Sequence, residues 1–410
     1  MRYDTKGNQA PDGVVGPYRQ KEGSYYTIRQ LWSPVRISMA KLPTGFTGAI
    51  PVQNDYAFVD LNTVSFNWQV AQFDVRGTGG GHSVMAEGTA HTGSIAAGAS
   101  GTLTLPLPAN WSTAHALLLD ATDAAGTLIG RWSWGIASST QMRTAIVSTT
   151  STAAAVATDA ATAVTVTAGG ATYTFSKTSG QLSSVTASGK KFSLSNGPVL
   201  SSGTGTLKSF AGAQDGNDYV VTVTYTGDLQ QVLWRIMGNG WLGLTYRYAL
   251  NGNYDHHGVT FTYPEAQVVG ADWLGRGPAR VYKNRMQGPW LDVWQREKNN
   301  AITGQVWDYP EFKGYFSETY WARLRTSEGA ILFVIDSPDV FLRLYTPANG
   351  SSPMTATTVY PTGDISFLYG ISPIGNKFSA AKDTGPQGQQ NVVNGTFEGT
   401  ICLHFGDSLP

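Results

Sequence analysis

Short runs of alternating apolar and polar residues, broken by turn-forming residues, make up most of this chain. In residues 64–70, for example, Val64, Phe66, Trp68 and Val70 alternate with Ser, Asn and Gln. Successive side chains of a β-strand point to opposite faces, so this period predicts half-buried strands. No stretch after residue 40 has the 3.6-residue period of a long helix. The pattern predicts an all-β fold, and the 48 glycines agree with it because they favour turns.

The charge balance excludes two classes of partner. Lys+Arg and Asp+Glu both number 28, and charged residues make up only 14% of the chain, against about 25% in an average soluble protein. A chain of zero net charge has no electrostatic attraction for nucleic acid or for an anionic membrane surface. The sequence contains no run of about 18 apolar residues, so it predicts no transmembrane helix. We therefore expect neither a nucleic acid nor a membrane as partner.

Cysteine and histidine usage predicts no metal and no cofactor. Cys402 is the single cysteine, which excludes an internal disulfide and any zinc site built on several cysteines. His256 and His257 are adjacent, so on a strand they point to opposite faces and cannot hold one ion together. No apolar segment typical of a signal peptide follows Met1. The location therefore stays open: cytoplasmic, or exported together with a missing upstream part.

The order of patterns along the chain predicts two β domains. Residues 1–35 are interpreted as a connector with one short helix over 22–32, and residues 36–150 hold about seven strands, as in an immunoglobulin-like β-sandwich. Residues 151–163 are almost only Ser, Thr and Ala, which is typical of a linker or an edge strand. Residues 164–410 are strand-like throughout and predict two large antiparallel sheets packed face to face.

One segment carries a family resemblance. Residues 272–285 read Asp-Trp-Leu-Gly-Arg-Gly-Pro-Ala-Arg-Val-Tyr-Lys-Asn-Arg. This segment resembles the start of the C-terminal small-chain domain of β-galactosidases in glycoside hydrolase family two, which has a Trp, then Gly-Arg-Gly-Pro, then an aromatic residue and an Arg. Residues 15–35, 50–68, 308–315 and 361–378 are similar to other parts of that region. The resemblance implies an immunoglobulin-like sandwich followed by an antiparallel β-supersandwich.

The catalytic part of that family has no counterpart in this chain. The family's two catalytic glutamates lie on a β/α barrel, one of them within an Asn-Glu pair, and this sequence contains no Asn-Glu dipeptide. A barrel of about 250 residues does not fit beside two β domains either. The resemblance therefore implies the non-barrel C-terminal portion or a subunit of such an enzyme. Its partners would be a barrel-bearing subunit, or further copies of itself, and a carbohydrate such as a galactoside or a plant polysaccharide.

The densest mixture of aromatic and charged residues lies between residues 273 and 320. Sugar sites combine aromatic surfaces with a few polar groups, so this stretch supplies the candidate site residues. The family resemblance adds a loop near residues 367–378, at the rim of the barrel's sugar site. The candidates for substrate binding are Arg285, Trp290, Trp294, Tyr309, Phe312, Lys313 and Phe378.

Two carboxylate pairs are candidates for catalysis if the chain is an enzyme by itself. Glu311 with Asp308 and Glu297 with Asp292 are the pairs, because glycoside hydrolysis uses two facing carboxyl groups. Such an enzyme would be a hydrolase, a lyase or a mutarotase-like protein, and a non-catalytic sugar-binding module is a further alternative. For each residue the structural alternative is a core aromatic or a charge at a strand end. Arg276 is interpreted as structural, bonding main-chain carbonyl groups.

Overall fold

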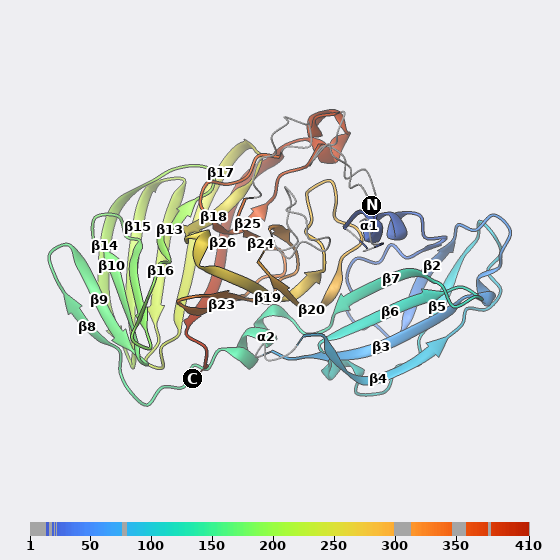
Figure 1. Cartoon of the computed structure of the whole chain (residues 1–410), viewed down its shortest axis with the longest axis horizontal. Helices are drawn as coiled ribbons and strands as arrows, with labels where there is room; N and C mark the ends of the chain where they lie inside the picture. Colours follow the sequence, from blue (N-terminus) through green and yellow to red (C-terminus); the bar gives the residue numbers. More distant parts are fainter. Residues whose placement is uncertain are drawn as a thin grey trace, which may run out of the picture.

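The computed structural model describes residues 14–15, 19, 21, 23–75, 80–298, 313–346, 358–375 and 379–409. This part of the chain is nearly all β, which confirms the predicted fold class, and its α-helices are α1 (Gly23–Leu31) and α2 (Ser139–Ile146). Neither helix is long and apolar enough to cross a membrane. Figure 1 shows a smaller body of blue and cyan strands at the right and a larger body of green to red strands at the left and centre.

The smaller body is a sandwich of seven strands, here called the first sandwich. One sheet has the order β1-β2-β5 and the other β4-β3-β6-β7, with antiparallel pairing throughout. Residues of both sheets share one apolar core. The strands are β1 (Val35–Arg36), β2 (Ala49–Asn54), β3 (Ser65–Phe73), β4 (His82–Ala90), β5 (Ser100–Thr104), β6 (Ala116–Thr122) and β7 (Leu128–Gly135).

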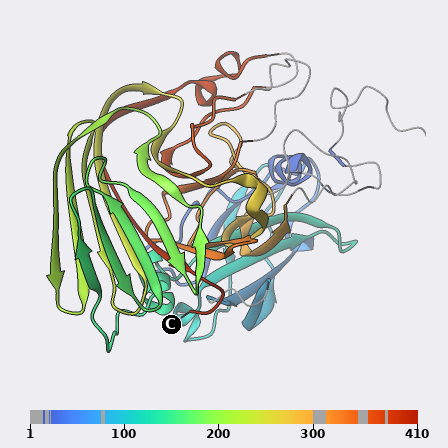
Figure 2. The ribbon, with the colours of Figure 1, turned by 60° about the vertical axis from the view of Figure 1, so that its left-hand side comes forward.

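The larger body is the second sandwich, built from two large antiparallel sheets, whose green strands Figure 2 shows as layers. The nine-stranded sheet has the order β14-β15-β16-β17-β26-β23-β22-β19-β20. Its strands are β14 (Gly205–Asp215), β15 (Asp218–Gly227), β16 (Leu229–Ile236), β17 (Leu242–Tyr254), β19 (Val268–Gly277), β20 (Trp290–Glu297), β22 (Trp321–Thr326), β23 (Gly329–Ile335) and β26 (Asn391–Phe405).

The ten-stranded sheet has the order β21-β24-β25-β18-β13-β11-β10-β9-β8, with β12 paired to β11. The strand β8 lies inside the predicted linker, at the edge of the sheet, where its main chain pairs with β9. The strands are β8 (Val156–Asp159), β9 (Ala163–Ala168), β10 (Ala171–Ser176), β11 (Leu182–Ala187), β12 (Lys190–Phe192), β13 (Ser195–Leu200), β18 (His257–Thr262), β21 (Gly314–Phe316), β24 (Phe341–Leu344) and β25 (Ile365–Gly370).

The two sandwiches share an apolar cluster at their junction. It contains Phe73 of β3, Met142 of α2, and Trp241, Leu291 and Trp321 of the second sandwich, each less than 9% exposed. Burial of large side chains from both bodies removes apolar surface from water on each side. The junction is therefore a packed core and not a loose linker between independent bodies.

Arg276 is one of several polar links across this junction. It lies on β19 and donates to the main-chain oxygens of Ser133 (3.1 Å) and Pro289 (3.2 Å). Its Nε also lies 2.5 Å from Oε2 of Glu318. The sequence interpretation, a structural arginine bonding main-chain carbonyls, agrees with these contacts, although the residue lies on a strand.

Candidate functional site

The outward face of the four-stranded sheet carries two rows of polar side chains. Along β3, Phe66, Trp68 and Val70 point into the core of the first sandwich, so Asn67 and Gln69 point outward. The same alternation holds on the neighbouring strands, which are in register with β3. Side chains at paired positions lie close enough to interact across the strands.

The first row runs across all four strands through Thr89, Asn67, Asp120 and Arg131. The hydroxyl of Thr89 donates to Oδ1 of Asn67 at 2.8 Å. The guanidinium of Arg131 binds both carboxylate oxygens of Asp120, and its Nε lies 2.6 Å from Oδ1. These hydrogen bonds raise the pKa of the Arg131 guanidinium above its ordinary value, so Arg131 stays positively charged.

The second row runs parallel to the first through Glu87, Gln69, Leu118 and Ser133. The amide nitrogen of Gln69 donates to Oε2 of Glu87 at 3.0 Å. Leu118 gives the row its apolar surface and is half-buried. The hydroxyl of Ser133 accepts from the main-chain N–H of Leu291 at 2.8 Å. The second row therefore ends at β20 of the second sandwich.

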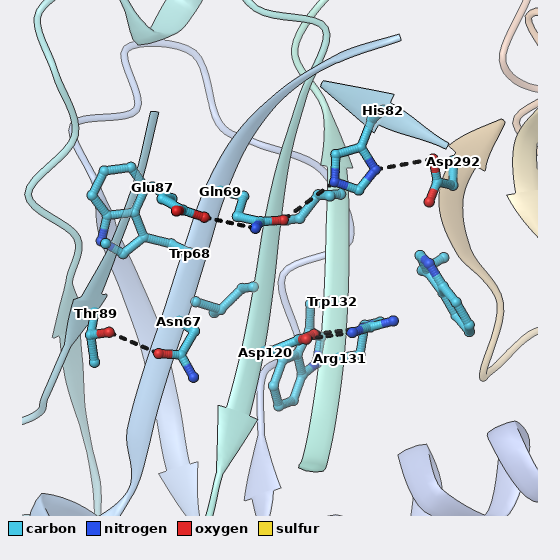
Figure 3. Close-up of a pocket in the computed structure, with 14 residues that line it drawn as sticks. Asn67, Trp68, Gln69, His82, Glu87, Thr89, Asp120, Arg131, Trp132 and Asp292 are labelled. Carbon is cyan, nitrogen blue, oxygen red and sulfur yellow. Dashed lines mark hydrogen bonds and ion pairs between the residues drawn. The ribbon is translucent and has the colours of Figure 1, made fainter. Parts of the chain in front are cut away.

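Strand β20 forms a wall beside these rows, and the two together enclose a cavity of about 520 Å³, here called the junction groove (Figure 3). Trp290 lies beside Arg131, whose guanidinium carbon is 4.8 Å from the ring centre. Asp292 accepts from His82, with 3.1 Å between Oδ1 and Nδ1. The other ring nitrogen of His82 lies 3.3 Å from Oε1 of Gln69. Asp292, His82, Gln69 and Glu87 thus form one chain of polar contacts.

The charged groups that line the groove are each in contact with another polar group of the groove. The ring nitrogens of His82 face a carboxylate and an amide oxygen, whereas a nucleophile-activating histidine needs a hydroxyl or thiol at one of them. Its three carboxylates, of Glu87, Asp120 and Asp292, each have a partner in the groove. Within the residues that the structure describes, no three Asp, Glu, His or Cys side chains gather as metal ligands.

Two of the candidate residues, Trp290 and Asp292, line the junction groove. Trp294 is half-buried, stacks on Trp273 with ring centres 6.5 Å apart, and donates to the carbonyl of Gly275. Arg285 is exposed in the loop before β20, and its main-chain oxygen accepts from Tyr282. Trp290 and Asp292 therefore both line the groove, whereas Trp294 and Arg285 are not among its lining residues.

The remaining candidates lie elsewhere. Glu297 lies five residues after Asp292 on β20, and five is an odd number, so the two carboxylates point to opposite faces of the strand. The carboxylate of Glu297 pairs instead with Arg325, at 2.8 Å. Lys313 is 5% exposed and pairs with Glu265 at 2.7 Å. Its ammonium is therefore held in an internal ion pair. Five candidates lie outside the described residues: Asp308, Tyr309, Glu311, Phe312 and Phe378.

The adjacent histidines have separate surroundings. His256 lies beside the hydroxyls of Ser201 and Ser202, while Nδ1 of His257 is 2.9 Å from the hydroxyl of Tyr248. Burial lowers the pKa of each ring to about 4. Both are therefore neutral at pH 7, in keeping with a structural role.

Nothing in the sequence distinguishes the floor of the groove from any other exposed strand face. Residues 64–70 were interpreted as a strand, and the outward residues of such a strand ordinarily contact water. The alternation identifies Asn67 and Gln69 as outward-facing. It contains no signal that β20, more than two hundred residues later, lies beside them.

Comparisons with known proteins identify no family. No family model and no curated protein matches the chain. Among solved structures, galactose 1-epimerase from Lactobacillus acidophilus has 10% identity and a TM-score of 0.35 over 60% of this chain and 94% of its own. The protein HI1317 has 7% identity and a TM-score of 0.33 over 61% of this chain and 98% of its own.

A third structure is the uncharacterised protein lmo2446 from Listeria monocytogenes, in complex with glucose, magnesium and calcium. It has 10% identity and a TM-score of 0.20, and the match covers 93% of this chain and 31% of that protein. All three TM-scores lie below 0.5, so we draw nothing about function from these similarities.

Proposed function

We propose that this chain is the non-barrel C-terminal portion, or a separate subunit, of a β-galactosidase-like glycoside hydrolase. The observation that carries the proposal is the position of the Gly-Arg-Gly-Pro block. Its arginine, Arg276, contacts Ser133 of the first sandwich and Glu318 of the second. The most specific part of the resemblance thus builds the contact between the two bodies that the resemblance implies.

The proposal assigns bond cleavage to a barrel-bearing partner. The chain has no Asn-Glu pair, and Asp292 and Glu297 do not face each other. This chain would then contribute carbohydrate-binding surface and assembly contacts. A surface for such a partner is present at the end of α1, where Leu31 and Trp32 are 62% and 79% exposed, because exposed large apolar side chains mark interaction sites.

Activity and size measurements test this proposal. The chain is assayed with 4-nitrophenyl β-D-galactoside, alone and mixed with a barrel-bearing glycoside hydrolase domain as candidate partner, and the mixture is examined by size-exclusion chromatography. We expect no turnover by the chain alone, and turnover together with co-elution in the mixture. Robust turnover by the isolated chain, or no complex and no added activity in the mixture, contradicts the proposal.

A pair of variants locates the partner surface. Trp32→Ala removes the most exposed side chain of the α1 region. We expect Trp32→Ala to weaken co-elution with the barrel protein. The matched variant Val392→Ala, at an 86% exposed position on β26, should leave it unchanged.

A further inference from the structure

We propose that the junction groove binds a neutral saccharide chain, held across the two side-chain rows of the four-stranded sheet and against Trp290. This binding site goes beyond the proposed function, because it needs no barrel partner. The charge of the groove, its hydrogen-bonding groups and its shape all favour such a ligand.

The charges of the groove disfavour an anionic ligand. Glu87, Asp120 and Asp292 contribute three carboxylates, and Arg131 is already bound to Asp120 through two hydrogen bonds. His82 is likewise held by Asp292. A phosphate, a nucleic acid or a uronate would meet these carboxylates without an unpaired cation to offset them, since like charges repel. The groove therefore suits an uncharged polar ligand.

The uncharged polar side chains of the groove have hydrogen-bonding capacity beyond their present contacts, and this capacity matches hydroxyl groups. Asn67 and Gln69 have amides that both donate and accept, and Thr89 has a hydroxyl. Neighbours in the same row already fix these side chains, at 2.8 Å between Thr89 and Asn67 and 3.0 Å between Gln69 and Glu87. Binding therefore costs little side-chain entropy, because the groups are ordered before the ligand arrives. A sugar hydroxyl, which donates and accepts, fits such groups.

The shape of the groove favours a chain of sugars over a single ring. The first row crosses four strands, and three inter-strand spacings of about 4.8 Å give about 14 Å. Leu118 on β6 and Trp290 on β20 both line the groove and supply apolar surface for the C–H faces of sugar rings. The groove also lies where two bodies meet, a common position for ligand sites.

Titration of the whole chain tests the proposal. Isothermal titration calorimetry is run with β-1,4-galactotetraose, cellotetraose and xylotetraose as neutral probes, and with a tetragalacturonate as the anionic probe. We expect at least one neutral tetrasaccharide to bind, the corresponding monosaccharide to bind at least about tenfold more weakly, and the anionic probe not to bind. Absence of binding by all three neutral probes, or preferential binding of the anionic probe, overturns the proposal.

Variants place the bound saccharide in the groove. Asn67→Ala with Gln69→Ala removes one polar group from each row and should lower the affinity at least about tenfold, the effect of losing one or two hydrogen bonds. Both residues lie on a solvent-facing surface, and an unchanged urea midpoint confirms folding. Thr172→Ala is the matched control, because Thr172 forms a similar cross-strand pair with Thr167 at 3.1 Å on β9 and β10.

The outcomes separate the two proposals. Equal affinity of the double variant and the wild type shows that the saccharide binds elsewhere and overturns the groove assignment. That result leaves the activity of a mixture with a barrel protein untouched. Conversely, if the chain forms no complex with a barrel protein, saccharide binding by the isolated chain is unaffected.

Discussion

Replacement of His404 by phenylalanine should make the protein less sensitive to acid. His404 lies on β26, is 8% exposed, and packs against Trp241 with ring centres 5.1 Å apart. Its Nδ1 has no hydrogen-bond partner among the described residues. Burial lowers the pKa of the ring from 6.5 to about 4. Phenylalanine keeps an aromatic ring beside Trp241 and removes the titrating group.

The size of the effect follows from proton linkage. Between pH 6.5 and 4 the unfolded chain binds a proton at this ring and the folded protein does not, so the free energy of unfolding falls as the pH falls. The stability is fully present above pH 6.5 and is lost progressively down to the folded-state pKa of about 4. At 1.36 kcal/mol per pKa unit, the loss between pH 7 and pH 5 is about 2 kcal/mol.

Urea unfolding at pH 7 and pH 5 measures this loss. The difference in unfolding free energy between wild type and His404→Phe cancels the contributions of His256 and His257, which both proteins keep. That difference should move by about 2 kcal/mol in favour of the variant at pH 5. The same substitution at exposed His91 is the control. Parallel pH dependence of wild type and His404→Phe would refute the reasoning.

Four further substitutions, one of them a control, test the packing of the second sandwich and its junction. Trp273→Ala, at a position 1% exposed, should cost about 3–5 kcal/mol of stability, and an unchanged melting temperature contradicts a core role. Arg276→Ala leaves the carboxylate of Glu318 unpaired at the junction; it should cost about 2 kcal/mol, and calorimetry should show a lower or split transition. Gly258→Ala should cost more than about 1 kcal/mol, because φ is +148° and the new Cβ would lie 2.2 Å from a main-chain oxygen. Gly395→Ala, where a Cβ meets nothing within 4 Å, should leave the urea midpoint nearly unchanged.

Local patterns in the sequence predicted the strands well. Residues 64–70 became part of β3, with Phe66 and Trp68 inside, because a period of two reports directly on which side chains can share a face. The short helix predicted over 22–32 is α1. Helix α2 was not predicted, although Ser138 and Gln141 form a capping box at its start, which is a recognisable local signal.

Properties that depend on distant residues were not predictable from local patterns. Lys313 was expected to contact a ligand from a loop, whereas its ammonium pairs with Glu265, 48 residues earlier in the sequence. The Ser/Thr/Ala composition of residues 151–163 predicted a linker or edge strand, and β8 forms there because main-chain pairing with β9 needs no large side chains. The groove likewise forms because β20 of one sheet lies beside the outward face of another, the four-stranded sheet that contains β3. This arrangement depends on residues that are far apart in the sequence.

The apolar cluster at the junction has a consequence for how such a chain can evolve. Phe73 and Met142 are encoded before the Ser/Thr/Ala segment, and Trp241 and Trp321 after it. A recombination event within residues 148–163 would bring one half of this cluster against a foreign surface, leaving large apolar side chains in contact with water. The Ser/Thr/Ala segment, although its composition is typical of a linker, is therefore an unfavourable position for recombination. The two sandwiches are expected to be inherited, duplicated and lost as one unit.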